Sequence, residues 1–224
     1  MNVFNISAAW RLTVRPIAVA LALAAWMVPP FNAAAQKASG ANQEMVEISE
    51  LTLDETLMVP EVPEKQKNYI RTVMKREAQS LQKMGYKVET MRRGEVVIAT
   101  IPADKLFAPN DTLLTASADA ALKPFLSYFR THGKFKVILA MHSDNTGSDR
   151  YLYDLTEKRI VSLYNYFDTK AAQTDMLQGY PMADSEPMAG MNNNSMKGRQ
   201  ANRRLELFIV PGPMLIVEAK SKKL

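Results

Sequence analysis

The sequence predicts an α/β fold in which helices pack on one mixed sheet. Segments with the periodicity of strands and of helices alternate over residues 95–210, and that order favours helices layered against a sheet. The run over 135–141 is mostly apolar, which is typical of a strand buried on both faces. The chain has 224 residues, of which 47% are hydrophobic and 23% charged, and this ordinary composition suits a globular domain.

Residues 1–35 have the layout of a secretory signal peptide. Arg11 and Arg15 precede an apolar run over 17–28, and small residues stand before the expected cleavage point after Ala35. The run is short for a membrane span, which favours cleavage over retention as a membrane anchor. We therefore expect an exported mature chain.

The residue types that are rare or missing narrow the classes of function. The chain has no cysteine, which excludes disulfides, thiol catalysis, cysteine-ligated metal and a lipidated N-terminal cysteine. Two separated histidines, His132 and His142, are too few for a typical zinc site. The formal net charge of +5 is mild and does not argue for nucleic acid as a partner. We expect no metal and no cofactor.

The first part of the mature chain is expected to be a flexible lead-in followed by a helix. Residues 36–63 are polar and acidic, and two prolines close the segment. Over 64–84, apolar residues recur at helical spacing between charged ones, and Gly85 would stop this helix. The sequence therefore predicts an amphipathic helix after the lead-in.

A hairpin is expected next. Strand patterns over 86–91 and 95–101 flank Arg92-Arg93-Gly94, a sequence suited to a turn. Together with the preceding helix, residues 64–94 are expected to form an extension ahead of the main domain, which would cover 95–210.

The main domain is expected to alternate helices and strands. Residues 114–130 look helical, but Pro124 must kink this helix or mark the first turn of a shorter one. The remaining predicted elements are a strand over 135–141, a long helix over 149–167, a short strand over 176–180, a loop over 181–195 and a last strand over 203–210. Residues 211–224 are expected to be a basic tail.

Arg159 breaks the apolar pattern of the long helix. It stands four residues after Leu155 and four before Leu163, and residues four apart share a helix face. A guanidinium on the buried stripe needs an anion and acceptors, because an unpaired buried charge is costly. A structural ion pair, or a stem that reaches out of the edge of the core, would also satisfy it.

Asp144 is a candidate anion for the same site. It follows the apolar strand by three residues, and open α/β sheets place ligand sites where a strand leads into a helix. Taken alone, Asp144 could equally cap the following helix or turn. Together, Asp144 and Arg159 would hold a ligand ammonium and a ligand carboxylate, a combination suited to an amino-acid head group.

Arg203 and Arg204 open the last strand. Because strand side chains alternate between faces, Arg203 shares a face with Leu205 and Leu207 and should lean toward the packed side. Arg204 and Glu206 should face away from it. Alternation alone therefore singles out Arg203 as a candidate for the site.

Four blocks of this sequence resemble the OmpA C-terminal-like family of peptidoglycan-binding domains, and the resemblance covers about residues 95–210. Their order and spacing agree with the family. The blocks are Leu106-Phe107 with Asn110, the turn from His142 to Gly147, the run from Leu155 to Arg159, and Gly-Arg-Gln-Ala-Asn-Arg-Arg from Gly198 to Arg204. The resemblance implies a two-layer OmpA-like sandwich of βαβαβ type, here preceded by an N-terminal helix and hairpin.

The resemblance also implies roles for single residues. In the family, the residues matching Asp144 and Arg159 bind the diaminopimelate of the peptidoglycan stem peptide, through its ammonium and its carboxylate respectively. Asn110, Thr146 and Arg203 match secondary contact positions. Leu152 stands where the family usually has Asn, which implies the loss of one polar contact.

We therefore expect a non-enzymatic, non-covalent anchor to peptidoglycan in the periplasm, associated with the outer membrane or cell wall. A stator-like component using the same domain is an alternative, but it would need a carboxylate in a membrane segment, and 17–28 has none. An adaptor is another alternative, with the helix over 64–84 and the Met-rich loop binding outer-membrane or other envelope proteins. His142, Ser143 and Asp144 adjoin, yet neighbouring strand residues face opposite sides, which argues against a hydrolase triad.

Overall fold

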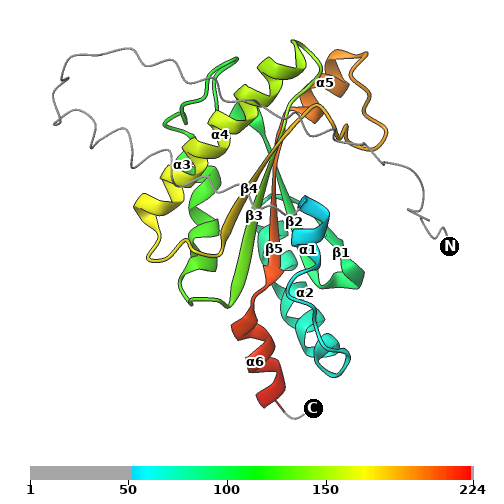
Figure 1. Ribbon diagram of the computed structural model, residues 1–224, viewed down its shortest axis with the longest axis vertical. Coiled ribbons are helices and arrows are strands. Elements are labelled where there is room, and N and C mark those ends of the chain that lie inside the picture. Colours follow the sequence, from blue (N-terminus) through cyan, green and yellow to red (C-terminus); the bar gives the residue numbers. More distant parts are fainter. Residues whose placement is uncertain (1–51, 223–224) are drawn as a thin grey trace, which may run out of the picture. The chain divides into compact units, whose positions relative to one another are not determined.

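The computed structural model describes residues 52–222, and they form a five-stranded mixed sheet with helices packed on it (Figure 1). The strand order is β1-β2-β5-β3-β4. β3 and β4 are parallel, and the other neighbouring strands are antiparallel. The strands are β1 Lys87–Met91, β2 Val96–Pro102, β3 Phe135–His142, β4 Leu177–Ala183 and β5 Arg204–Pro211. The predicted fold class is confirmed.

The helices alternate with these strands as the periodicity indicated. The α-helices are α1 Leu53–Met58, α2 Lys67–Lys83, α3 Ala118–Leu122, α4 Asp149–Lys170, α5 Met196–Asn202 and α6 Pro213–Ser221. The 3-10 helices are η1 Glu64–Gln66, η2 Arg92–Gly94, η3 Ala103–Lys105 and η4 Lys123–Phe129. Pro124 lies in the first turn of η4, where its missing N–H is not needed, so the helix predicted over 114–130 is divided there.

The sheet buries β3 completely, because its neighbours lie on both sides and side chains cover both faces. All eight residues of β3 are buried, as the apolar run predicted. α4 is the crossover that joins β3 to the parallel strand β4. β4 is an edge strand and extends to Ala183, past the end that we predicted, since an edge can accommodate Pro181.

The larger core lies on the face of the sheet that α2, α4 and α6 cover. It joins Ile70 and Met74 of α2 to Leu163 and Phe167 of α4. Edge-to-face and tilted aromatic pairs fill the space between the helices, with the ring centroids of Phe129 and Phe167 5.3 Å apart. Since α2 and β1 share this core and this sheet, the segment 64–94 packs as part of the same layer structure.

The opposite face of the sheet carries a smaller core, to which α1 contributes Leu57. The segment expected to be a flexible lead-in is therefore ordered from Thr52 onward, and its remaining residues lie outside the described part. A capping box between Thr52 and Glu55 begins α1. Lys136 of β3 donates hydrogen bonds to the carbonyls of Thr56, at 2.5 Å, and Val59 at the end of the helix.

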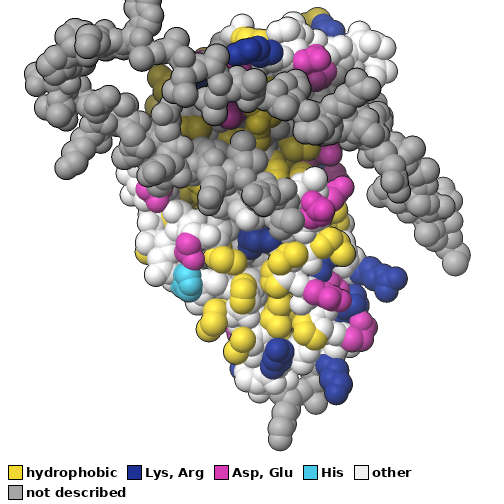
Figure 2. Space-filling model, viewed as in Figure 1, with side chains coloured by type: hydrophobic (Ala, Val, Ile, Leu, Met, Phe, Trp, Pro, Cys, Tyr) yellow, Lys and Arg dark blue, Asp and Glu magenta, His cyan; other side chains and the backbone are white. Residues whose placement is uncertain are grey.

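The segment expected to be a basic tail also forms a helix, α6. Pro213 stands at its start, and Leu215 and Ile216 are buried against the main core. Our interpretation gave weight to the lysines from Lys220 onward and missed these two apolar residues. In Figure 2, hydrophobic side chains gather over the lower half of the molecule, where Figure 1 places α1 and α6.

The signal-peptide prediction concerns residues 1–35, which lie outside the described residues. Within residues 52–222, no helix combines the length and the apolar character that a membrane span requires.

Candidate functional site

Asp144 stands at the start of the candidate site, two residues beyond the end of β3. Its side chain is 6% exposed, and the backbone N–H of Thr146 donates to its Oδ1 at 2.8 Å. Ser148, rather than Asp144, caps α4, because the Ser148 hydroxyl oxygen accepts a hydrogen bond from the N–H of Tyr151. Asp144 therefore does not cap the helix, but its hydrogen bond from Thr146, two residues on, caps the turn, as the alternative expectation for this residue allowed.

Gly147 makes the turn from β3 into α4 possible. Its φ is +144°, and a Cβ at this position would lie 2.7 Å from the ring of Tyr151. The ring thus lies against the turn, beside the site. A glycine in this place keeps Asp144 and the first turn of α4 close together.

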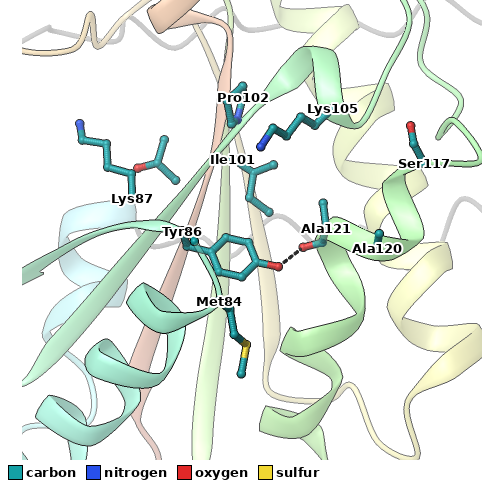
Figure 3. A pocket seen from close by; sticks show the side chains of 11 residues that line it. Met84, Tyr86, Lys87, Ile101, Pro102, Lys105, Ser117, Ala120 and Ala121 are labelled. Atoms are coloured by element: carbon teal, nitrogen blue, oxygen red, sulfur yellow. Dashed lines mark hydrogen bonds between the residues drawn. The ribbon is translucent and has the colours of Figure 1, made fainter.

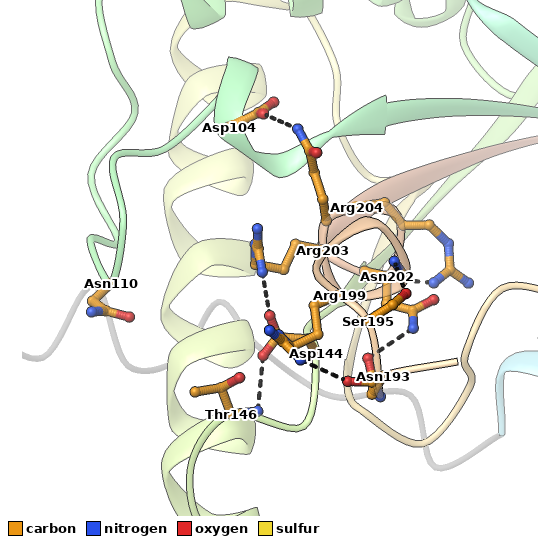
Figure 4. Close-up of polar contacts among 12 residues, drawn as sticks. Asp104, Asn110, Asp144, Thr146, Asn193, Ser195, Arg199, Asn202, Arg203 and Arg204 are labelled. Carbon is orange, nitrogen blue, oxygen red and sulfur yellow. Dashed lines mark hydrogen bonds and ion pairs between the residues drawn. The ribbon is translucent and has the colours of Figure 1, made fainter. Parts of the chain in front are cut away.

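Arg203 forms an ion pair with the other oxygen of Asp144, and Figure 4 shows Asp144 between Arg203 and Thr146. Burial alone would raise the pKa of the Asp144 carboxyl, but the hydrogen bonds from Thr146 and Arg203 outweigh it and leave this pKa below its usual value. Asp144 is therefore a carboxylate at neutral pH. Each of its oxygens still has a lone pair for a ligand ammonium.

Arg159 is buried on α4, as the spacing predicted, with 4% of the residue exposed. Its Nε donates to the carbonyl of Asp111 at 2.9 Å, and its guanidinium lies 4.8 Å from the ring centroid of Phe107. Within the described residues, no carboxylate forms an ion pair with Arg159. The structure therefore does not show the structural ion pair that was the alternative reading of this residue.

The guanidiniums of Arg159 and Arg203 influence each other. Burial lowers the pKa of Arg159 most, and the positive charge of Arg203 lowers it further. The two groups therefore carry like charges that lie within electrostatic reach of each other. An anion placed between them would relieve this repulsion.

Asn110 and Tyr151 form the far side of the site. Asn110 has a φ of +57°, a conformation that asparagine tolerates better than most residues, and its Oδ1 accepts a 3.3 Å hydrogen bond from the hydroxyl of Tyr151. Tyr151 was not among the residues that we singled out. It stands eight residues before Arg159, about two helical turns, and that spacing was the signal that could have found it.

All five predicted site residues line one hollow of about 280 Å³. The hollow combines two carboxylates, of Asp104 and Asp144, with two guanidiniums, an amide and an apolar side, and this combination can hold a small zwitterion. Its volume is just below the usual range for small-molecule pockets, which suits a group of amino-acid size. Its lining includes Phe107, Asn110, Asp144, Thr146, Tyr151, Leu152, Leu155, Arg159 and Arg203. We call it the zwitterion pocket.

Arg204 and Glu206 face away from the side on which Leu205 packs, as alternation predicted, but this opposite face is covered as well. Arg204 is 5% exposed, and its Nε donates to Glu206 Oε1 at 2.7 Å. Glu206 also lies 3.5 Å from Nε2 of the buried His142. The side away from Leu205 is covered here by the chain around Glu186, whose carbonyl accepts a 3.2 Å hydrogen bond from Arg204. His142 thus lies in a sealed cluster, apart from the zwitterion pocket.

The block from Gly198 to Arg204 begins in a helix, α5, that we did not predict. A Cβ on Gly198 would lie 1.7 Å from the carbonyl oxygen of Asn192, so only glycine fits this contact. The Asn202 side chain accepts from the N–H of Met188 and donates to the carbonyl of Met191, which ties the Met-rich loop to α5. This packing sets where Arg203 leaves α5 and points toward Asp144.

No group of three or more acidic, histidine or cysteine side chains arranged as a metal site occurs among residues 52–222.

Several curated proteins match about half of the chain. The chain is 28% identical over 124 residues to outer membrane protein P5 of Haemophilus influenzae, and 26% identical over 117 residues to photosystem I P700 chlorophyll a apoprotein A2 of Gloeobacter violaceus. Each match spans about half of this chain, but only 35% of the first protein and 13% of the second. The chain thus covers only a part of these relatives. No protein-family model matches the chain.

Solved structures show the same fold. A MotB-like protein from Desulfovibrio vulgaris aligns with a TM-score of 0.56 at 18% identity, covering 65% of this chain and 98% of the other. The cell wall anchor of the type VI secretion system from Pseudomonas aeruginosa aligns with a TM-score of 0.50 at 23% identity, covering 60% and 93%. The chain is also 28% identical over 119 residues to outer membrane protein A of Escherichia fergusonii, covering 49% of each chain, and the predicted resemblance to an OmpA C-terminal-like domain is confirmed.

Proposed function

We propose that the zwitterion pocket binds the diaminopimelate head group of the peptidoglycan stem peptide and so anchors the protein to the cell wall without covalent chemistry. The observation that carries the proposal is that Asp144 and Arg159, fifteen residues apart, line one hollow of about 280 Å³. Asp144 would accept from the ligand ammonium. Arg159 would donate to the ligand carboxylate.

The pocket geometry leaves the needed hydrogen-bonding capacity free. The Nε of Arg159 donates to the carbonyl of Asp111, and its two Nη groups can still form a two-pronged contact with the ligand carboxylate. Arg203 can donate to the same ligand carboxylate while it holds Asp144 in place. The like charges of Arg159 and Arg203 favour a ligand carboxylate placed between their two guanidinium groups.

The comparisons support the cellular setting of this proposal. P5 is named as an outer membrane protein, and the Pseudomonas aeruginosa structure is named as a cell wall anchor. Because this chain covers only a part of its curated relatives, its place in the periplasm beside the outer membrane or cell wall is part of the proposal. The proposed partner is peptidoglycan.

Pull-down by purified sacculi tests the proposal with the full chain. Arg159→Ala and Asp144→Ala are each expected to abolish the pull-down while circular dichroism stays native. Arg150→Ala is the matched control, since Arg150 lies on the same helix with a side chain that is 93% exposed and outside the pocket. Native-like binding by both site variants would refute the site.

Competition by free diaminopimelate separates recognition of the head group from loose electrostatic attraction. Specific binding is expected to be displaced by the free amino acid and to persist at moderate salt. Binding that salt removes and diaminopimelate does not displace would be non-specific attraction to the wall.

A further inference from the structure

β1 is an edge strand of the sheet, because β2 is the only strand that pairs with it among the described residues (Figure 1). The hydrogen bonds of β2 determine which groups of β1 lie on its open side. The N–H of Ala103, just after β2, donates to the carbonyl of Arg203 at 2.9 Å. Bonded positions alternate along antiparallel strands, so the odd-numbered residues of β2 bond to β5 and the even-numbered ones bond to β1.

Val88 and Thr90 therefore point their backbone N–H and C=O groups away from the sheet. The even-numbered residues of β2 pair with Lys87, Glu89 and Met91, which leaves the two residues between them for the open side. Within residues 52–222, no hydrogen bond uses these outward groups of Val88 and Thr90. The open side of β1 thus has donors and acceptors for a further strand.

β1 lacks the backbone features that usually protect the edge of a sheet. It contains no proline and no glycine, and Lys87, Glu89 and Thr90 are exposed. β4, the strand at the opposite edge, contains Pro181, which has no N–H to donate. β1 is therefore the edge that is better suited to accept a strand.

Tyr86 fixes the start of β1 before any partner arrives. Its hydroxyl donates a 2.8 Å hydrogen bond to the carbonyl of Ala121, and its ring packs edge-to-face on Phe125 with centroids 5.1 Å apart. Figure 3 shows the Tyr86 ring and the Lys87 side chain extending in opposite directions. Because the edge is already ordered, pairing with a second strand costs little further conformational entropy.

The charges on β1 limit the kind of strand that fits it. Lys87 and Glu89 lie on the same face of the sheet and pair at 3.0 Å, with side chains that are 53% and 60% exposed. Side chains directly opposite each other on antiparallel strands interact, and like charges in such positions are destabilising. A fitting strand therefore places an acid opposite Lys87 and a base opposite Glu89.

β1 of a second copy meets this requirement. In antiparallel pairing about Val88, Lys87 of each copy lies opposite the partner's Glu89, so the four charges alternate. Val88 and the partner's Val88 exchange two backbone hydrogen bonds, because their N–H and C=O groups both point outward. Pairing about Glu89 would use the same backbone groups but would place two glutamates opposite each other.

We propose that β1 is a self-association edge, at which two copies of this chain join antiparallel about Val88 into one continuous sheet. In this register the N–H of Thr90 donates to the carbonyl of the partner's Tyr86. No residue of β1 lines the zwitterion pocket, so the pairing leaves the residues of that pocket unused.

Hydrogen exchange of the ¹⁵N-labelled full chain tests the proposal at single residues. As the protein concentration rises and sedimentation detects dimers, exchange of the Val88 and Thr90 amides is expected to slow about tenfold or more, because both become donors to the partner strand. The amides of Lys87 and Glu89 already bond to β2 and should change much less.

Three results would overturn the proposal. The first is a chain that stays monomeric at millimolar concentration. The second is a dimer in which the Val88 and Thr90 amides stay unprotected, since the interface would then lie elsewhere. The third is full protection of both amides at low concentration, which would show that a segment of the same chain already covers this edge.

Exchange of the two charges tests the register. Lys87→Glu places a glutamate opposite the partner's Glu89, and Glu89→Lys places a lysine opposite the partner's Lys87, so each is expected to weaken dimerisation about tenfold or more. The double variant restores the alternation and should dimerise as wild type. Arg150→Glu, the same change of charge at a side chain that is 93% exposed on α4, is the control.

Wild-type dimerisation in both single variants, or no recovery in the double variant, would refute this register. None of the substituted residues lines the zwitterion pocket, so the affinity of the stem peptide for each pocket, measured by calorimetric titration, is expected to stay unchanged. A failure of the wall-binding proposal and a failure of the self-association proposal are therefore recognised separately.

Discussion

Two arginine–carboxylate pairs lie on opposite faces of the sheet, at the same end of β5. Arg203 pairs with Asp144 in the zwitterion pocket, and its side chain is 44% exposed. Arg204, the next residue, pairs with Glu206, and its side chain is 6% exposed. The same two chemical groups therefore occur once in an open hollow and once in a sealed cluster.

The difference between the pairs lies in how much of their hydrogen-bonding capacity is already used. In the sealed pair, Arg204 donates to Glu206, to the carbonyl of Asn202 and to the carbonyl of Glu186. In the open pair, Arg203 donates to Asp144 alone among the described residues. The sealed pair thus stabilises the fold, while the open pair keeps donors and acceptors for a guest.

The largest expected effect is on stability, from Arg204→Ala. Removing this guanidinium leaves the Glu206 carboxylate, which is 18% exposed, without its 2.7 Å ion-pair partner, which costs about 3 kcal/mol in the free energy of unfolding. Arg203→Ala is the matched comparison and should cost less, because the Arg203 side chain is 44% exposed and the buried Asp144 carboxylate keeps its hydrogen bond from the N–H of Thr146. Urea unfolding measures both, and equal losses would contradict the division into a sealed and an open pair.

The loss of stability at acid pH tests the same comparison between the two arginine–carboxylate pairs. Burial alone would raise the pKa of Glu206, but His142 and Arg204 outweigh it and lower this pKa from 4.5 to about 2. Since the pKa is lower in the folded state, the Glu206 carboxylate stabilises the fold above pH 4.5, and this contribution is lost as pH falls toward 2.

Glu206→Gln is therefore expected to flatten the fall of the unfolding free energy between pH 4.5 and 2. Urea unfolding at a series of pH values in this window provides the measurement. Glu89→Gln is the control, because this glutamate is exposed on β1 and should leave the profile as it is. An unchanged slope in Glu206→Gln would show that other carboxyls dominate the acid unfolding.

Local periodicity predicted the elements of the fold and the position of Arg159. The apolar stripe of a helix repeats every three to four residues, so the sequence alone placed Arg159 on the buried face of α4. The apolar run of β3 was equally local. Both features are set by residues that are close together in the chain, so they can be predicted from a single sequence.

The contacts between distant segments could not be predicted in the same way. Alternation put Arg204 on the face opposite Leu205, but it could not show that the chain around Glu186 covers that face. The pair between Arg203 and Asp144 joins residues 59 positions apart. α1 and α5 were missed because they are short, and α6 was missed because its apolar run was assigned to a basic tail.

The next largest expected effect is a loss of ligand affinity in Arg203→Ala. In our proposal this variant removes one of two guanidiniums from the ligand carboxylate and frees Asp144, so affinity for a diaminopimelate-containing stem peptide should fall about tenfold, as for one charged hydrogen bond. Arg199→Ala, which removes a side chain outside the pocket, is the control. Calorimetric titration measures the affinity, and a gain in Arg203→Ala would show that Arg203 competes with the ligand ammonium for Asp144.

The smallest expected effect on affinity comes from Leu152, which lines the zwitterion pocket and is 1% exposed. Leu152→Asn would place an amide where the resemblance implies that one polar contact is lost. One neutral hydrogen bond contributes about 1 kcal/mol, so affinity for the stem peptide should rise about fivefold. The same change removes buried apolar surface, so the free energy of unfolding should fall.

Leu152→Ala separates these two consequences, because it enlarges the hollow without adding a donor or acceptor. It should lose about 2–5 kcal/mol in the free energy of unfolding and gain no affinity. Binding by all three proteins must be compared at a temperature where each is fully folded. If Leu152→Ala gains as much affinity as Leu152→Asn, the limit on binding is the space beside Arg159 rather than a missing polar contact, and the apolar side of the pocket would then act through its volume.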